Sequence, residues 1–131
     1  MKSTIKTFAL VALLISAIAV TIGSCSKKTE NQPPVVNLEE PAANETFALS
    51  DSVHIEGTVT DDESLHEMSV VVTNATGNKV FEQYPTVHEL TTYSFHYHFH
   101  PGTAGTYNLE VTAEDHDGER ATATRAFVVA Q

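Results

Sequence analysis

The chain of 131 residues is long enough for about one domain, and its composition, 41% hydrophobic and 18% charged, is that of a folded globular protein. Seven basic against 17 acidic residues give a net charge of -10, which argues against a nucleic-acid partner because a phosphate backbone needs clustered cations. The single cysteine excludes an internal disulfide and the cysteine-rich zinc modules.

Residues 1–24 have the layout of a signal peptide. Lys2 and Lys6 make the start basic, and residues 8–22 then run without a charge. That run is short for a membrane-spanning helix, which needs about 20 apolar residues. Small residues follow it and lead into Cys25, the only cysteine of the chain. The pattern predicts a cleaved targeting signal.

The segment Ile22-Gly23-Ser24-Cys25 resembles the lipobox of bacterial lipoproteins, with Ile where Leu is more usual. The resemblance implies that the Cys25 thiol is diacylglycerylated, that the chain is cut before it, and that the new amino terminus is acylated, for example with palmitate. Three acyl chains would anchor the protein stably in a membrane. Ser26 after the cysteine favours the outer membrane in such lipoproteins, with the periplasmic or surface face left open. The alternative is an ordinary secretory signal with an incidental cysteine.

Residues 25–33 are expected to be a lipidated tether, and residues 34–131 the folded domain. The tether holds two lysines and no large apolar residue, which makes it too polar to fold. Loss of residues 1–24 would remove two lysines and no acid. The mature chain would then carry five basic and 17 acidic residues, for a net charge of -12.

Beyond the tether, apolar residues alternate with period two, which is the pattern of β-strands. The most regular stretch has Tyr and Phe on one face and mainly His on the other. No amphipathic helix is evident. About seven short strands in roughly 100 residues predict an all-β fold, a single antiparallel immunoglobulin-like β-sandwich. The strand segments are predicted over residues 35–38, 46–49, 52–60, 65–73, 79–84, 91–100, 106–113 and 121–129.

Residues 105–111 and 113–118 resemble the penultimate strand and last turn of bacterial immunoglobulin-like, PKD-like and cadherin-like domains. Residues 59–65 resemble the turn between their second and third strands. The resemblance implies that Tyr107 is the residue of a tyrosine corner. The whole chain resembles small Gram-negative lipoproteins that carry one such domain behind a lipobox. This implies a fold but little about activity, because the scaffold hosts many functions.

Histidine is the unusual feature of the domain, and three of the seven form His96-Tyr97-His98-Phe99-His100. Residues i and i+2 of a strand point the same way, about 6.6 Å apart at a rise of about 3.3 Å per residue, so their imidazoles can converge on one metal ion. An immunoglobulin-like strand order places residues 52–60 antiparallel to this strand. A register with His54 opposite His98 also sets Glu56 opposite His96. We therefore predict an outer-face zinc or copper cluster with these members: His54, Glu56, His96, His98 and His100. The alternative is that these histidines merely face water.

A second cluster follows from the same topology, because three connections are expected at one end of the sandwich. Cadherin-like domains bind calcium with acidic end loops, but their fuller motifs are absent here, and mixed His and Asp equally suit zinc. The alternative is turn chemistry, in which Asp and Gly serve the backbone. The candidate ligands at this end are Asp61, Asp62, His66, His88, Asp115, His116 and Asp117.

An enzymatic function is not expected. No nucleophile elbow appears, Cys25 would be consumed by the lipid, and the paired carboxylates Asp61 and Asp62 fall in a turn with no evident cleft. The sequence predicts a lipid-anchored, non-catalytic module of the cell envelope that binds a protein or a glycan. Zinc or copper binding through histidine is one alternative, and a calcium-stiffened domain is another.

Overall fold

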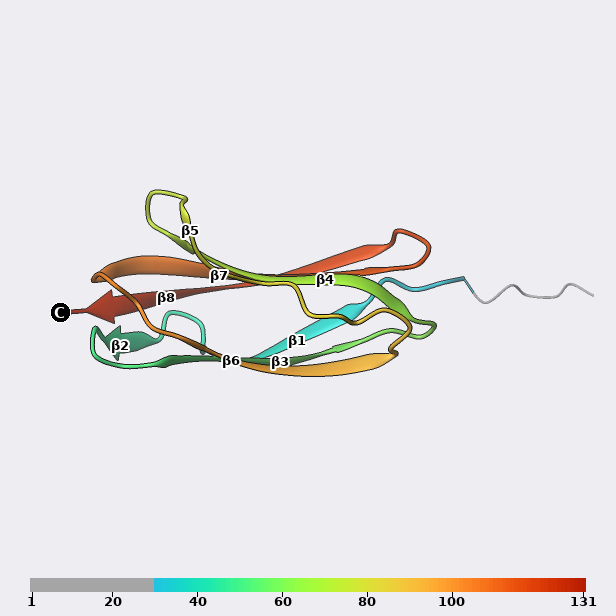
Figure 1. The fold of residues 1–131 in the computed structure, drawn as a ribbon, viewed down its shortest axis with the longest axis horizontal. Coiled ribbons are helices and arrows are strands. Elements are labelled where there is room, and N and C mark those ends of the chain that lie inside the picture. Colours follow the sequence, from blue (N-terminus) through green and yellow to red (C-terminus); the bar gives the residue numbers. More distant parts are fainter. Residues whose placement is uncertain (1–29) are drawn as a thin grey trace, which may run out of the picture.

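The computed structural model describes residues 30–131, so the predictions on the signal peptide and Cys25 lie outside the described residues. The described residues form eight strands and no helix (Figure 1). The strands are β1 (Val35–Glu40), β2 (Thr46–Ala48), β3 (Val53–Thr60), β4 (Leu65–Asn74), β5 (Lys79–Gln83), β6 (Thr92–Phe99), β7 (Gly105–Asp115) and β8 (Arg120–Ala130). Every predicted segment overlaps one of these strands, with ends that agree to within two residues.

The strands form two sheets that pack face to face. One sheet has the order β1-β3-β6 and the other has the order β2-β8-β7-β4-β5. All pairs are antiparallel except β2 with β8, which is parallel. The predicted all-β sandwich of about seven strands is therefore confirmed, but its purely antiparallel pairing needs correction. The chain changes sheet between β1 and β2 while keeping its direction, so the short β2 meets β8 as an eighth, parallel strand.

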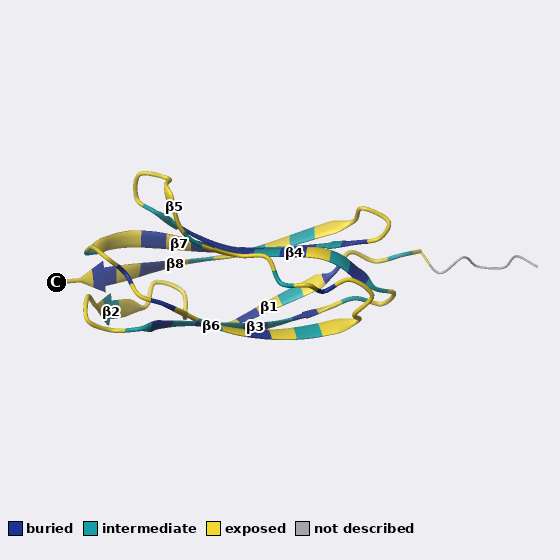
Figure 2. Cartoon of the chain, in the orientation of Figure 1, coloured by how far each residue is buried: buried dark blue, intermediate teal, exposed yellow. Residues whose placement is uncertain are grey.

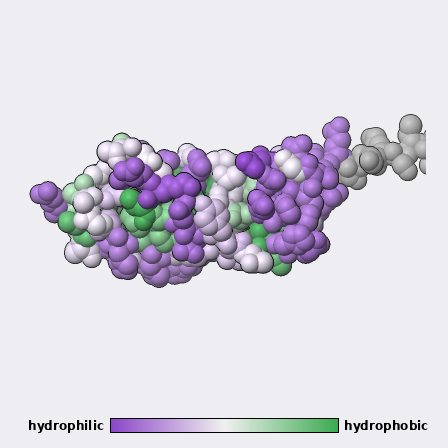
Figure 3. Space-filling view, turned by 45° about the horizontal axis from the view of Figure 1, so that its top comes forward, coloured by the Kyte–Doolittle hydropathy of each residue, from purple (hydrophilic) through white to green (hydrophobic). Residues whose placement is uncertain are grey.

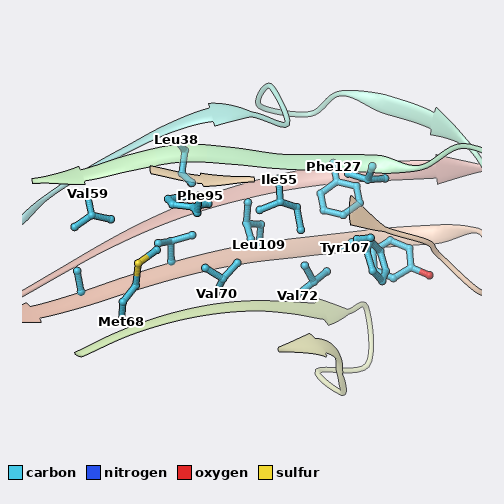
Figure 4. Close-up of a cluster of buried hydrophobic side chains, with 14 of the residues drawn as sticks. Leu38, Ile55, Val59, Met68, Val70, Val72, Phe95, Tyr107, Leu109 and Phe127 are labelled. Carbon is cyan, nitrogen blue, oxygen red and sulfur yellow. The ribbon is translucent and has the colours of Figure 1, made fainter. Parts of the chain in front are cut away.

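The core lies between the two sheets, where the alternating apolar residues of each strand face inward (Figures 2 and 4). On β3 the inward residues Val53, Ile55 and Val59 are fully buried, as the sequence pattern predicts. Phe95 and Phe99 of β6 are buried in the same way, while the outward residues between them stay exposed. This alternation fixes the outer face of the three-stranded sheet as the face that carries the histidines.

Tyr107 closes one side of the core and confirms the predicted tyrosine corner. Its side chain is buried, and its hydroxyl donates a hydrogen bond of 2.6 Å to the backbone carbonyl of Thr103, four residues upstream. Its ring stacks on Phe127, with ring centroids 5.5 Å apart. Strand β7 is thereby fixed to the loop before it and to the neighbouring strand β8.

Among residues 30–131, no helix is long and apolar enough to cross a membrane.

Candidate functional site

The first candidate site lies on the outer face of the three-stranded sheet, across strands β3 and β6. The register has His54 opposite His98 and Glu56 opposite His96, which confirms the predicted pairing. These four residues form a rectangle, because alternate residues of two neighbouring strands point to the same face. We call them the sheet-face cluster.

The three imidazoles of the sheet-face cluster are close together. Each offers one nitrogen, and these nitrogens all lie within 4.8 Å of one another. The ring centroid of His98 lies 4.5 Å from that of His54 and 4.7 Å from that of His96. His54 and His96, which face each other diagonally, are 5.4 Å apart. The arrangement therefore brings three metal-binding side chains to one place on a regular sheet.

Carboxylates border the three imidazoles. Glu56 Oε1 lies 3.1 Å from His96 Nε2 and 3.5 Å from His54 Nδ1. Glu40 Oε2 lies 4.0 Å from His54 Nδ1 on the other side. Both carboxylates increase the negative potential at the cluster, which favours a cation there.

Sequence reasoning missed Glu40 because of a bulge in β1. By simple alternation Glu40 would share the inward face of Leu38, which is buried in the core. The pairing of β1 with β3 shifts between Leu38 and Glu40, so Glu40 instead pairs with Glu56 and shares its outward face. Nothing in the amino-acid pattern signals this shift.

His100 is a predicted member that the structure does not bring to the group. It follows the end of β6 and is exposed, and the residues whose ligand atoms lie within 4.8 Å of one another do not include it. Ser52 is a neighbour that the sequence did not single out. Its hydroxyl lies 3.3 Å from His98 Nδ1, which leaves Nε2 of that ring free for another partner.

The second candidate site lies at the end of the domain where the described chain begins, drawn at the right of Figure 1. Here backbone hydrogen bonds hold the β5–β6 connection against the start of β4. Leu65 N–H donates to the carbonyl of Leu90 at 2.7 Å, and Glu89 N–H donates to the carbonyl of Leu65 at 3.1 Å. Asp61 N–H donates to the carbonyl of Thr91 at 2.9 Å. The expected meeting of connections at one end is confirmed.

Three histidines from separate segments meet at this end. His66 comes from the start of β4, His88 from the β5–β6 connection and His116 from the β7–β8 turn. Their ring centroids are 4.6 to 5.4 Å apart, and one nitrogen of each lies within 4.8 Å of the others. We call His66, His88 and His116 the end cluster. Figure 3 shows that the surface at this end, beside the grey trace, is mostly hydrophilic.

Three of the aspartates predicted as ligands at this end accept hydrogen bonds from turn backbone or from the tether. Asp115 is buried, and its carboxylate accepts hydrogen bonds from the backbone N–H groups of Asp117 and Glu119 and from the side-chain amide of Asn31. Burial raises the pKa of the Asp115 carboxyl, but the hydrogen bonds together outweigh it and hold that pKa below its ordinary value. Asp115 thus organises the β7–β8 turn.

Two more of these aspartates make similar local contacts. Asp61 Oδ1 accepts the backbone N–H of Glu63 at 3.0 Å, and Asp62 Oδ1 accepts that of Gln32 at 3.4 Å. Within residues 30–131, none of the predicted aspartates belongs to a group of three whose ligand atoms lie within 4.8 Å. Calcium binding at this end stays a prediction.

Glu89 follows His88 in the connection that the sequence places at this end, but it was not among the predicted ligands. Its Oε1 lies 3.3 Å from His116 Nε2 and 3.5 Å from His88 Nδ1. Its backbone has a φ of 68°, in the left-handed region that residues other than glycine seldom adopt. The position of Glu89 depends on how the β5–β6 connection folds, and no spacing in the sequence predicts it.

A family model described as "Bacterial Ig domain" matches residues 34–111. No protein with a curated description matches the chain.

Three solved structures are similar to this chain. An engineered protein is 20% identical with a TM-score of 0.52 over 75% of this chain, which spans 20% of that protein. A fibronectin(III)-like module of Clostridium thermocellum CbhA is 20% identical, with a TM-score of 0.51, over 72% of this chain and 94% of the module. These two similarities show a shared fold alone. The PKD1 domain of Vibrio anguillarum Epp is 25% identical, with a TM-score of 0.45, over 76% of this chain and 96% of that domain.

Proposed function

This chain belongs to the bacterial Ig domain family, and we propose that it is a non-catalytic module of the cell envelope that binds zinc or copper through its sheet-face cluster. One observation carries the proposal. Three imidazoles on two paired strands have their nitrogens within 4.8 Å of one another, with the Glu56 carboxylate among them. Three histidines and a carboxylate or a water are a common ligand set for Zn²⁺.

The imidazole nitrogens of the sheet-face cluster are close enough that small side-chain rotations would bring them into zinc-binding geometry. Two nitrogens on one tetrahedral zinc ion lie about 3.4 Å apart, given Zn–N distances of about 2.0–2.1 Å. The nitrogens of the cluster lie within 4.8 Å and belong to exposed side chains on a rigid sheet, so rotations about χ1 and χ2 would bring them together. Glu40, and Ser52 at His98 Nδ1, are placed to fix ring orientation, as partners of metal-bound imidazoles do.

The site would exchange its metal rather than hold it permanently. The side chains of His54 and His96 are 44% and 52% exposed. Structural zinc sites have four protein ligands and are closed, whereas an open site keeps a position for water or for another molecule's ligand. An exposed site on a tethered domain suits capture or transfer of metal in the envelope.

The membrane anchor is a separate part of the proposal. It rests on the lipobox-like segment that ends at Cys25, which would tether the domain to the outer membrane through acyl chains. The net charge of -12 predicted for the mature chain would concentrate cations near the domain. Anchoring and charge would together keep a metal-binding domain where envelope cations pass.

Zinc titration of the full chain tests the metal proposal. The protein is purified without a polyhistidine tag, stripped of metal and titrated in a calorimeter. We expect saturable binding at micromolar affinity or better, and His96→Gln/His98→Gln should take up one zinc fewer than the wild type. His100→Gln is the matched control and should bind as the wild type does. Equal zinc uptake by the double variant and the wild type, at equal affinity, would contradict the proposal.

Copper is the second metal that these ligands fit. Imidazole sites generally bind Cu²⁺ more tightly than Zn²⁺, so we expect the same double variant to lose copper uptake as well.

Binding of an envelope protein or a glycan is a second candidate function, favoured by one observation. Tyr84 is 63% exposed and lines two adjacent shallow depressions together with Glu67 and Met68. Exposed aromatic rings with a polar hydroxyl are typical of contact surfaces. We expect Tyr84→Ala to weaken retention of the protein on isolated cell-wall glycan, measured by co-sedimentation. Unchanged retention would remove the support for this role.

A further inference from the structure

A second set of three imidazoles lies at the opposite end of β3 from the sheet-face cluster. We propose that the end cluster is a second metal site, one that takes Zn²⁺ and ties three connections of the fold together. The inference does not depend on the sheet-face cluster. Glu56, the sheet-face residue of β3 nearest this end, is four residues from Thr60, about 13 Å at a rise of about 3.3 Å per residue, and the two clusters share no histidine, so the two sites would fill independently.

The end cluster is held in place by backbone structure rather than by one regular strand. His66 belongs to β4, whose first residue exchanges hydrogen bonds with the β5–β6 connection that carries His88. His116 belongs to the turn that the Asp115 carboxylate organises. The backbone that carries each ring is therefore in place before any ion binds, which lowers the ordering cost of forming a metal site.

Glu89 lies close enough to the end cluster to supply a fourth ligand. Its carboxylate lies between His88 and His116, within 3.5 Å of a nitrogen on each ring. Its left-handed backbone is held by the hydrogen bond from Glu89 N–H to Leu65. Left-handed backbone at a residue other than glycine is an unfavourable conformation that tends to occur at binding sites. Three imidazoles and one carboxylate satisfy the tetrahedral preference of Zn²⁺.

His66 adds an independent observation. Its Nδ1 is buried and has no hydrogen-bond partner among residues 30–131, although the side chain as a whole is 39% exposed. A buried polar atom without a partner is uncommon and calls for an explanation. Coordination of Nδ1 would satisfy this nitrogen, with Nε2 left facing Glu67 at 3.9 Å.

The wide separation of the three ligands in the sequence means that zinc at the end cluster would stabilise the folded state more selectively than zinc at the sheet-face cluster. His66, His88 and His116 are far apart in the sequence, so the unfolded chain cannot gather them, and zinc would bind the folded state alone. His96 and His98 are two residues apart and remain a local chelating pair after unfolding. Binding restricted to the folded state stabilises by the full mass-action term, whereas binding to both states stabilises by less.

Hydrogen exchange with and without zinc tests this inference, again on the full chain purified without a polyhistidine tag. The reporters are two amides of the β5–β6 connection: Glu89 N–H donates to the carbonyl of Leu65 in β4, and Leu90 N–H donates to the carbonyl of Val87. If the β5–β6 connection cannot open while zinc is bound, zinc at 100 times its Kd lowers the population of the open state about 100-fold, and exchange of these amides slows by the same factor. We expect His88→Gln/His116→Gln to abolish the slowing and to bind one zinc fewer in calorimetry. His100→Gln, a histidine outside both clusters, is the matched control.

The variants keep the two proposals separate. His96→Gln/His98→Gln should retain the zinc-dependent slowing while losing one zinc, so loss of binding in that variant alone concerns the sheet-face cluster. The melting temperature of each variant without metal checks that the fold is intact. Zinc-dependent slowing in the His88→Gln/His116→Gln variant equal to that of the wild type would overturn the inference. So would the absence of any slowing in a wild-type protein that binds zinc.

Discussion

At the scale of single residues, Gly57 shows how tightly the two strands that carry the sheet-face cluster pack. A Cβ atom at this position would lie 2.7 Å from Cζ of Phe95 and would also clash with the backbone carbonyl of Asn37. Backbone cannot move aside as a flexible side chain can. The absence of a side chain at residue 57 therefore lets β1, β3 and the Phe95 ring approach one another.

Replacement of this glycine is predicted to destabilise the domain. Gly57→Ala overpacks a well-filled interior, which typically costs about 1–3 kcal/mol. Urea denaturation followed by tyrosine fluorescence would measure the loss. Gly102→Ala is the matched control, because a Cβ there meets nothing within 4 Å, and its effect should be small or stabilising. Equal stability of the two variants would contradict the packing argument.

Single residues also mark where sequence reasoning succeeds. Strict alternation on β3 and β6 determines which face His54 and His98 occupy, and the immunoglobulin-like order determines that the strands are neighbours, so their pairing is predictable. Glu40 and Glu89 depend on a bulge and on a left-handed backbone residue. Both features arise from tertiary packing, which local pattern does not encode. Glu40 was therefore missed, and Glu89 could be placed at the shared end but not identified as a ligand.

At the scale of elements, the β7–β8 turn shows how a predicted ligand can have another task. Two backbone N–H groups converge on the Asp115 carboxylate, and Asn31 of the tether binds its other oxygen. The turn and the start of the described chain are therefore joined through one side chain. His116 follows directly, so the placement of the end cluster depends on the same carboxylate.

Loss of this carboxylate is predicted to weaken both the turn and the end cluster. Asp115→Ala leaves two partly buried backbone donors without their acceptor, at a cost of about 1–3 kcal/mol. Urea denaturation in the presence of a chelator would measure this cost without a contribution from metal. Asp117→Ala is the control, because the Asp117 carboxylate accepts no hydrogen bond within residues 30–131, and a change within about 0.5 kcal/mol is expected. Similar losses in both variants would show that the Asp115 contacts contribute little.

The positions of the strands along the chain were predictable, whereas the pairing direction of β2 and the paths of the connections were not. Period-two alternation located all eight strands, but β2 was expected to pair like its neighbours and instead lies parallel to β8. Alternation reports which residues face the core and carries no information on strand direction. Topology predicts that His66, His88 and His116 lie at the same end of the sandwich. Their close approach also depends on the detailed path of the β5–β6 connection, which topology does not predict.

At the scale of the whole molecule, the described chain begins and ends at opposite ends of the sandwich (Figure 1). Asn31 and Gln32 of the predicted tether contact Asp115 and Asp62, so the end cluster is at the tethered end and the carboxyl terminus is remote from it. If Cys25 is lipidated, the end cluster would face the membrane surface, and the outer face of the three-stranded sheet would lie along the side of the domain.

The anchor itself is predicted to depend on one residue. Cys25→Ser removes the thiol that would carry the diacylglycerol, so the protein should no longer incorporate labelled palmitate and should move from the membrane fraction to the soluble fraction. Radiolabelling and fractionation of cells that express either form would measure both effects. Palmitate incorporation that persists in the variant would contradict lipidation at this cysteine.

Convergence of the sheet-face histidines on one metal ion can be observed by NMR of the imidazole ring nitrogens during a zinc titration. We expect the ring-nitrogen signals of His54, His96 and His98 to shift together in a single saturable step, with those of His100 unchanged. Any shift of His66, His88 and His116 would form a separate step. Gradual shifts of all seven histidines that never saturate, with the signals of His100 moving as far as those of His96, would mean that zinc binds only loosely to an acidic surface and that the cluster is not a metal site.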